Sequence, residues 1–311
     1  MPLTLLEHSK LAYNNGEEKS AALIEIFARE SPWLSSMVFD TIQGSAYAYN
    51  VEGALPGIAF RGINEAYTES VGVINPRVEA LRICGGDLDC DLSLIQTQGP
   101  QARAKHEAMK MKALAAEVTR VLIKGDSIAQ PREFDGLQAR LAGNQLVSNS
   151  AAAGGAGLSL TQLDLAISRC ANATAIWAPS VIAQRFSAAW RTTAISGAVM
   201  TGGTDSFGRP VMMYAGLPIL VAYPDNDGTE PIDLLEVTTG GGATTTSLYV
   251  VGIGDGYLKG IQSGPMQVRD LGELDTAPVM RTRVEWLMGL VLEHPRAAVR
   301  VHNIANAAIT A

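Results

Sequence analysis

The segment between residues 39 and 80 restricts the fold of this chain more than any other part of the sequence. The strings SAYAYNVEG and GIAFRGINEAYTESVGVI alternate large residues with small or polar ones, and glycine and proline separate them. This pattern predicts a β-hairpin with its turn near residues 53–57. Arms of about 12 residues would reach roughly 40 Å. An isolated two-stranded hairpin is marginal in water, so the ribbon needs a surface that a chain of this size does not readily supply.

The composition favours a surface that is covered by other copies of the chain. Charged residues make up 18% of the 311 residues, against about 25% in typical globular proteins, and the net charge is -7. Glycine, alanine, serine and threonine replace the missing charge. We therefore expect neighbouring copies to cover much of the surface, and we expect the hairpin and the N-terminal segment to gain their order from those neighbours.

Several classes of protein are excluded by simple patterns. The sequence contains no run of about 18 apolar residues, so no transmembrane helix is expected. The first residues lack the basic start and the apolar run of a secretory signal. Three cysteines are too few for a disulfide scaffold, which favours a reducing compartment. The negative net charge gives no general attraction to nucleic acid.

Two helical segments and a terminal sheet are predicted on either side of a compact region. Residues 2–30 read as helical but carry too little apolar surface for a core of their own. Residues 100–124 predict a long helix whose apolar face comprises Ala104, Ala108, Met111, Ala115, Val118 and Leu122. Residues 81–98 read as a strand and a loop, and residues 126–262 as an α/β or α+β region. Residues 279–286 predict a strand with one wet face, paired with residues 297–302, and the tail after Ile304 is expected to fray.

Residues suited to catalysis or metal binding do not form a recognisable set. The four histidines, His8, His106, His294 and His302, have no His or Cys at ligand spacing, and Cys84 and Cys90 have no second pair for zinc. The glycine runs lack the Lys-Ser/Thr that completes a phosphate loop, and no nucleophile elbow is present. We therefore expect no catalytic, cofactor-binding or metal-binding residues and no cofactor.

Two charge features leave alternatives open. Asp87, Asp89 and Asp91 would share one face of a strand, where they could hold a hard cation, or form a solvated strand face or salt bridges to a neighbour. The string at 225–228, DNDG, resembles the start of a calcium loop, but a plain turn is favoured. Basic residues crowd the first half of the long helix, where they form a solvated face or face a packaged polyanion: Arg103, Lys105, Lys110 and Lys112.

Taken in order, these segments resemble the tailed-phage major capsid proteins of the Hong Kong 97 type. The resemblance is carried by a series of strings spread over nearly the whole chain: Glu25-Ile-Phe-Ala-Arg-Glu-Ser31, Thr41-Ile-Gln-Gly44, Asn64-Glu-Ala-Tyr-Thr-Glu-Ser70, Glu133-Phe-Asp-Gly-Leu137, Val268-Arg-Asp-Leu-Gly-Glu-Leu274 and Arg281-Thr-Arg-Val-Glu-Trp286. The implied fold class is α+β, the Hong Kong 97-type capsid fold.

The resemblance implies a role for each segment. Residues 1–38 would be an N-terminal arm and residues 39–78 an extended loop lying over a neighbouring subunit. Residues 79–135 and 263–304 would form a peripheral domain around the long helix. Residues 136–262 would form an axial domain, with the loop at 238–246 near the capsomer centre, and residues 305–311 a C-terminal tail.

The same resemblance implies a structural protein without catalysis. Copies would assemble through hexamers and pentamers into an icosahedral shell around double-stranded DNA, in the bacterial host cytoplasm, and would then reside in the virion capsid. Partners would be the protein itself, a portal and separate scaffolding or decoration proteins, with no membrane. Residues 39–80 contain no lysine, so the covalent cross-link of the prototype is not expected. The chain starts almost at the arm, so any scaffolding is expected to come from a separate protein.

Two alternatives keep parts of this interpretation. An encapsulin-like compartment would use the same fold to house a cargo enzyme, and a soluble α/β enzyme would place its site near residues 87–91. For a shell, we predict that charged residues in charge-poor segments make contacts between chains: Arg61, Glu65, Arg269, Asp270 and Glu273.

Overall fold

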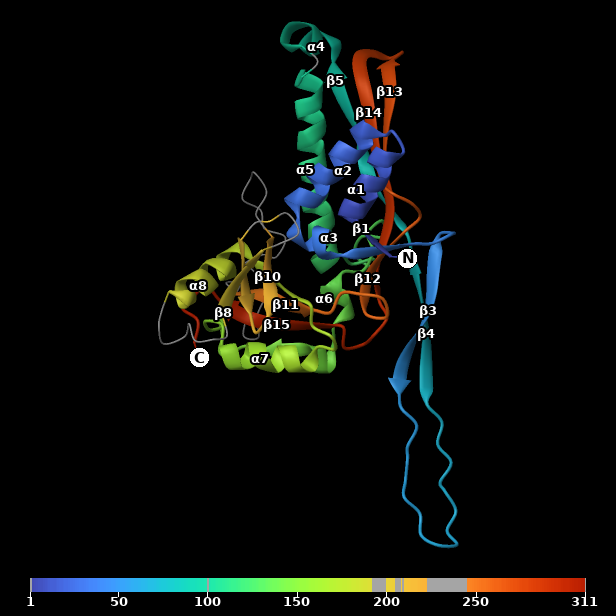
Figure 1. Ribbon diagram of the computed structural model, residues 1–311, viewed down its shortest axis with the longest axis vertical. Helices are drawn as coiled ribbons and strands as arrows, with labels where there is room; N and C mark the ends of the chain where they lie inside the picture. The colour runs from blue at the N-terminus through green and yellow to red at the C-terminus, as the bar shows by residue number, and fades with distance from the viewer. Residues whose placement is uncertain are drawn as a thin grey trace.

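Three parts are visible in the computed structural model, which describes residues 2–99, 101–191, 200–204, 208, 210–222 and 245–310. Figure 1 shows an upright body around a long helix, a second body beside its foot, and a two-stranded hairpin that projects away from both. The expected loop at 238–246 and the DNDG string at 225–228 fall wholly or mostly outside the described residues.

The upright body is built on a six-stranded sheet in the order β1-β2-β12-β14-β13, with β5 also paired to β14. The bounds are β1 Leu3–Thr4, β2 Val38–Thr41, β5 Arg82–Asp91, β12 Leu258–Gln262, β13 Gln267–Leu274 and β14 Ala277–Leu292. Thr282, Val284 and Trp286 are buried while the residues between them are partly exposed, so the predicted wet and dry faces of this strand are confirmed. Residues 92–98, expected as a loop, form helix α4 (Leu92–Gln98), which Asp91 caps through the Ser93 amide at 2.7 Å.

The long helix predicted at residues 100–124 is confirmed as α5 (Gln101–Lys124), and it lies along this sheet. Met111, Val118 and Leu122 are buried, but Ala104 is exposed and Ala108 only partly covered, so the predicted apolar face is wrong in the first turns. The reason is polar packing. Glu107 is buried there instead, and it accepts a hydrogen bond from the Thr282 hydroxyl at 2.7 Å.

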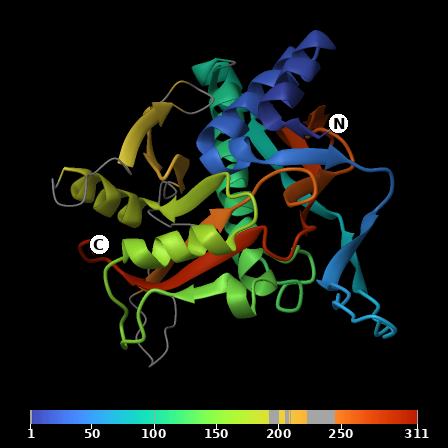
Figure 2. The same cartoon turned by 60° about the horizontal axis from the view of Figure 1, so that its bottom comes forward.

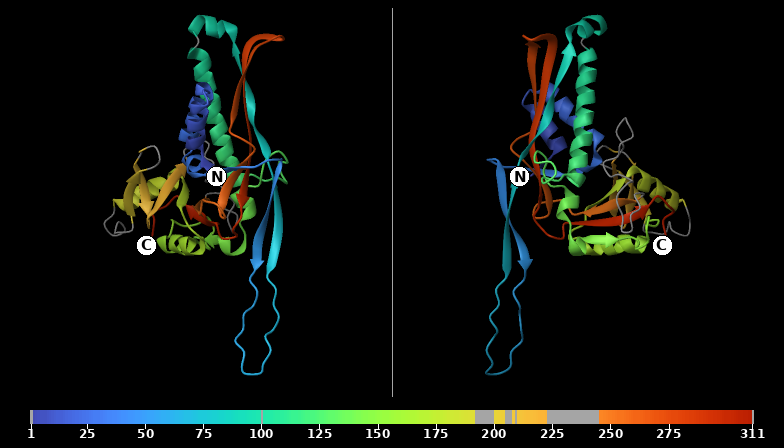
Figure 3. Two further views of the ribbon diagram at one scale, coloured as in Figure 1. Left: turned by 45° about the vertical axis from the view of Figure 1, so that its right-hand side comes forward. Right: turned by 180° about the vertical axis from the view of Figure 1, so that it is seen from behind.

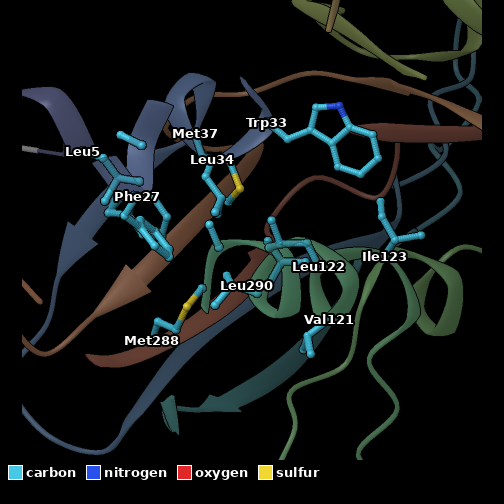
Figure 4. Close-up of a cluster of buried hydrophobic side chains, with 14 of the residues drawn as sticks. Leu5, Phe27, Trp33, Leu34, Met37, Val121, Leu122, Ile123, Met288 and Leu290 are labelled. Carbon is cyan, nitrogen blue, oxygen red and sulfur yellow. The ribbon is translucent and has the colours of Figure 1, made fainter. Parts of the chain in front are cut away.

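The N-terminal helices belong to the body of their own chain. They are α1 (Leu5–Asn14), α2 (Glu18–Glu30) and α3 (Pro32–Ser36). Phe27 and Trp33 are fully buried, and Figure 4 shows both in one cluster with side chains from α5 and β14. Phe27 meets Trp286 edge-on at 5.6 Å. The expectation that this segment gains its order from neighbours is therefore wrong, because its apolar residues find their partners within the chain.

The second body contains a seven-stranded sheet in the order β6-β15-β11-β7-β10-β9-β8. The bounds are β6 Leu146–Ser148, β7 Ala175–Pro179, β8 Met200–Thr204, β9 Pro210–Tyr214, β10 Leu217–Ala222, β11 Thr245–Val251 and β15 Ala298–Ala305. One face carries helices α7 (Leu160–Arg169) and α8 (Ser180–Trp190), as Figure 2 shows, and the other face packs toward α3. β7 and β11 are buried throughout because both faces are covered.

Strand β15 corrects a prediction about pairing. Residues 297–302 were expected to pair with the strand at 279–286, but β15 pairs with β11 and β6 in the second sheet. The turn at 293–297 carries the chain from one sheet to the other. The tail is also better held than expected. The Leu160 amide donates to the Thr310 carbonyl at 2.9 Å, the Thr310 amide donates to the Leu158 carbonyl at 2.9 Å, and Ile309 is buried.

The hairpin pairs β3 (Ala46–Ala54) with β4 (Val73–Ala80), and Figure 3 shows its far end clear of both bodies. The turn expected near residues 53–57 is wrong. The ladder ends at the Ala54–Val73 pair, just before Pro56, which cannot donate to a ladder. The chain continues to a turn at residues 62–65, where Asn64 adopts φ 67°, a conformation that asparagine tolerates. Residues 55–72 are called the hairpin tip below.

Candidate assembly surface

The hairpin tip exposes apolar side chains that a solitary protein would normally bury. Phe60 is 106% exposed, Ile58 95% and Ile63 94%. Further large apolar side chains along the hairpin are more than half exposed: Leu55, Tyr67, Val71, Val73, Ile74 and Val78. Large apolar side chains exposed together on one element mark a surface that meets another molecule.

The tip keeps its shape through short-range polar contacts. The Gly62 amide donates to the Glu65 carboxylate at 2.8 Å, and the Arg61 guanidinium donates to the Glu65 carbonyl at 3.1 Å. Arg61 also lies over the Tyr67 ring at 5.1 Å. Across the tip, the Gly57 amide donates to the Ser70 hydroxyl at 2.7 Å. The polar groups therefore organise the tip and leave its apolar side chains facing outward.

The root of the hairpin is anchored to the upright body by a buried lysine. Lys259 is 2% exposed, and its ammonium lies 2.9 Å from Asp255, 2.9 Å from Glu293 and 3.4 Å from Asp40. Burial lowers the pKa of Lys259, but its hydrogen bonds to Asp255 and Glu293 outweigh this and hold the pKa above its usual value. The Tyr47 hydroxyl of β3 donates to Glu293 at 2.9 Å. One strand of the hairpin is thereby tied to β2, β12 and the end of β14.

The other strand has its own anchor. Arg140 of α6 (Leu137–Arg140) grips the Glu79 carboxylate of β4 through both terminal nitrogens, one of them at 2.9 Å. The Tyr49 hydroxyl donates to the same carboxylate at 3.3 Å. Ring stacking between Tyr47 and Tyr49, at 6.0 Å, joins the two anchors. The root is therefore tied to the body, while the tip lies clear of both bodies and makes its polar contacts within itself.

Sequence reasoning missed this root. The spacing of Tyr47 and Tyr49 on one face of a strand was a usable signal, as was a lysine inside the otherwise uncharged strand LKGIQ. The partners Glu79, Arg140 and Glu293 are far from them in the sequence, so no local pattern connects these residues.

Replacing Lys259 with methionine is expected to destabilise the root strongly. The change leaves Glu293 and Asp40 without their cation in a largely buried site, and breaking one partner of such a pair costs about 3–5 kcal/mol in the free energy of unfolding. Urea unfolding measures this loss. Lys105→Met, at an exposed position on α5, is the matched control and should change the unfolding free energy by less than about 0.5 kcal/mol.

Two aspartates of strand β5 pair with arginines on the neighbouring strand β14. Arg283 binds Asp87 at 2.7 and 2.8 Å, and Arg281 binds Asp89 at 2.6 and 2.6 Å. These hydrogen bonds hold the pKa of both carboxyl groups below the usual value. Asp91 caps α4 instead of sharing this site. The salt-bridge interpretation is therefore confirmed, and the alternative of a hard-cation site is not supported.

The opposite face of this sheet holds a second charge network. Arg103 binds Asp270 at 2.6 Å and Glu107 at 3.2 Å, and Lys19 of α2 binds Glu107 at 2.9 Å. Lys112 pairs with Glu30 at 3.2 Å. Much of the basic face of α5 is therefore engaged within the chain, whereas Lys105 is exposed.

The five predicted contact residues lie in two regions. Arg61 and Glu65 meet each other in the hairpin tip. Arg269, Asp270 and Glu273 lie on β13, where Arg269 pairs with Glu285 and Asp270 with Arg103. Glu273 is exposed at the outer end of this strand. The structure does not bring the two groups together within one chain, and their contact with other chains stays a prediction.

Reactive or metal-binding chemistry finds little support in the described part of the chain. Burial raises the pKa of the Cys84 and Cys170 thiols to about 11, so neither is an activated nucleophile. Over the described ranges, no group of three or more His, Cys, Asp or Glu side chains could hold a metal ion. No helix within those ranges is both long and apolar enough to cross a membrane.

A long helix beside a sheet of long antiparallel strands, a second body and a projecting hairpin define the class of shell-forming proteins with the Hong Kong 97-type capsid fold. Solved structures agree. Matches of this fold include the encapsulin in the holo-SrpI complex of Synechococcus elongatus PCC 7942, at TM-score 0.62 and 15% identity over 90% of this chain and 89% of that one. The structure of Mycobacterium phage Bobi matches at TM-score 0.60 and 13% identity, over 88% of this chain and 90% of that one. The structure of Microbacterium phage Oxtober96 matches at TM-score 0.61 and 9% identity, over 89% of this chain and 91% of that one.

The sequence itself identifies the family. Residues 15–177 match the family described as major capsid protein GP7, which is more than half of the chain. The chain belongs to this family of phage major capsid proteins, and it is a capsid shell protein. No curated protein matches the sequence.

Proposed function

We propose that this protein is the repeating subunit of an icosahedral shell that assembles through hexamers and pentamers and encloses double-stranded phage DNA. It acts structurally, without catalysis and without a cofactor. The observation that carries the proposal is the hairpin, which is anchored at its root and exposes an apolar tip. A ribbon of this kind is complete only when the tip lies on a second copy of the chain.

The energetics favour such a lattice. Burying a Leu, Ile, Val or Phe side chain contributes about 1.5–3 kcal/mol, so covering about half of the exposed apolar side chains of one hairpin contributes on the order of 10 kcal/mol before ordering costs. Each subunit both gives and receives a hairpin, so individually weak contacts add through multivalency. The low charge of the chain reduces the desolvation cost of these contacts.

We assign each segment a role within this shell. Residues 1–38 form an N-terminal arm docked on its own subunit, and residues 39–78 form the extended loop. Residues 79–135 with the strands from 263 form the peripheral domain, and most of residues 136–262 the axial domain. β12 is better grouped with the peripheral domain, because its pairing partners are β14 and β2. β15 is better grouped with the axial domain, because its pairing partners are β11 and β6. Assembly in the host cytoplasm, with a portal and separate scaffolding or decoration proteins, belongs to the same proposal.

The contents of the particle test this proposal. Particles purified from phage-infected or phage-producing cells should protect genome-length double-stranded DNA from nuclease. An encapsulin-like compartment is the second candidate, favoured by the similarity to the Synechococcus elongatus encapsulin. Particles that lack DNA and contain one co-purifying enzyme would support that candidate and contradict the DNA-filled shell.

Charge reversal tests the proposed contacts between chains. Within the described residues Glu273 forms no ion pair, so Glu273→Lys breaks none there. The change should weaken assembly, raising the concentration at half-assembly about tenfold if a facing cation is lost. Arg61→Glu should act similarly at the tip. Light scattering against protein concentration gives the measurement, and an unchanged assembly curve would remove the substituted residue from the interface.

A further inference from the structure

A buried histidine holds the first helix on the upright body. His8 of α1 is 6% exposed, and its Nε2 atom lies 2.8 Å from the side-chain nitrogen of Gln262. Gln262, in β12, is itself fully buried, and its nitrogen also lies 3.4 Å from the Thr41 hydroxyl. This polar chain joins α1 to β2 and β12, beneath the N-terminal helices.

The orientation of the Gln262 amide follows from its third neighbour. The Trp286 indole N–H lies 3.0 Å from Gln262 Oε1, and an indole nitrogen can only donate. The amide oxygen must therefore face Trp286, so the amide NH₂ faces His8. Two donors cannot bond to each other, so His8 Nε2 must accept. The ring is then neutral and carries its proton on Nδ1.

A proton on Nε2 would break this arrangement. A charged His8 presents N–H to the NH₂ of Gln262. Flipping the amide would satisfy His8 but would leave the indole N–H of Trp286, a residue that is 1% exposed, facing another donor. Either response leaves a buried donor unsatisfied, which is costly. The amide oxygen of Gln262 faces Trp286, so it cannot also accept a hydrogen bond from His8, which lies at the amide nitrogen.

Nearby charges offer little compensation. Glu7, next to His8, raises its pKa but is itself bound to the Thr4 backbone at 2.7 Å. Strand β1 and helix α3 carry no ionisable side chain. On β2 and β12, Asp40 and Lys259 pair with each other, and the α2 carboxylates nearest α1, Glu18 and Glu25, line the outer groove between these helices.

We propose that His8 is a proton-sensitive latch: its neutral ring holds α1 on the body, and uptake of one proton releases α1. This inference concerns the subunit itself and does not depend on the proposed contents of the shell.

The direction of the effect follows from proton linkage. Burial lowers the pKa of His8 below its usual value near 6.5, which outweighs the opposing effect of Glu7. The released helix therefore binds the proton more readily than the docked helix does. Docking is fully stable above about pH 6.5 and weakens as the pH falls from there toward the lower pKa of docked His8.

Hydrogen exchange of the full-length chain tests the latch. After correction for intrinsic exchange rates, protection of residues 5–14 should fall about tenfold per pH unit below about pH 6.5. His8→Gln, which cannot titrate, should remove this dependence. His106→Gln, at an exposed position on α5, is the matched control and should keep it. Equal pH dependence in wild type and His8→Gln would overturn the proposal.

A measurement on the unsubstituted protein guards against a variant that fails to fold. Nitrogen-15 labelling of histidine reports which ring nitrogen carries the proton. The proposal requires His8 to be the Nδ1–H tautomer at about pH 7.5, and the Nε2–H tautomer or a charged ring at that pH would overturn it.

Discussion

A chain in which residues 55–72 are replaced by an Asn-Gly turn is expected to fold normally and to lose assembly. Asn-Gly suits a two-residue hairpin loop, and the Ala54–Val73 pair lies next to it. The tip makes no contact with the body, so the free energy of unfolding of the subunit should change by less than about 0.5 kcal/mol. Shell formation, followed by light scattering and electron microscopy, should be abolished.

Point variants that keep the full length of the hairpin test its apolar contacts without changing how far the hairpin extends. Phe60→Ser removes a side chain that is 106% exposed in the subunit, so it cannot destabilise the isolated fold. If the ring is buried on a neighbour, losing about 1.5–3 kcal/mol per contact raises the concentration at half-assembly about 10- to 100-fold. Ile128→Ser, 92% exposed outside the hairpin, is the matched control and should have a much smaller effect. Assembly of the tip-replaced chain at unchanged concentration would contradict this role.

Trp33→Ala is expected to cause the largest loss of subunit stability. Trp33 is fully buried, stacks on Trp177 at 5.1 Å with an interplanar angle of 7°, and donates its indole N–H to the Leu220 carbonyl at 2.9 Å. It therefore joins the N-terminal helices to the second sheet. Truncating a buried tryptophan costs about 3–5 kcal/mol, and the variant also loses the hydrogen bond to the Leu220 carbonyl.

Two further variants show whether this loss is specific. Urea unfolding in the tip-replaced background excludes any contribution from assembly. Trp190→Ala, at a tryptophan that is 41% exposed, should cost no more than about 1 kcal/mol. Trp33→Phe keeps an aromatic ring in the stack and should cost clearly less than Trp33→Ala. Equal losses for Trp33→Ala and Trp190→Ala would contradict a central role for Trp33.

The sequence predicted elements well wherever one local pattern decides the structure. The steps between Met111 and Leu122 predict the buried face of α5 correctly, and the alternation from 279 to 286 predicts the two faces of β14. In the first turns of α5 the pattern failed because a buried carboxylate, Glu107, replaces an apolar contact. A polar network is satisfied by distant partners, so a local pattern cannot reveal it.

Partners across the chain were the part that local reasoning could not predict. β15 resembles any short apolar strand, and its choice of β11 over β14 depends on how both sheets pack. The N-terminal helices looked too poor in apolar residues to belong to a core, yet Phe27 and Trp33 meet Trp286 and Trp177, over a hundred residues away. The hairpin was predicted as an element, but its turn was placed too early because glycine and proline near 53–57 also suit an irregular extended strand.

The position of residues 55–72 in an assembled particle tests the central claim most directly. Purified protein imaged by electron cryomicroscopy should form closed shells, and the density for the hairpin tip should lie on a neighbouring copy of the chain. A protein that stays monomeric at high concentration, with the tip packed against its own subunit, would contradict the account.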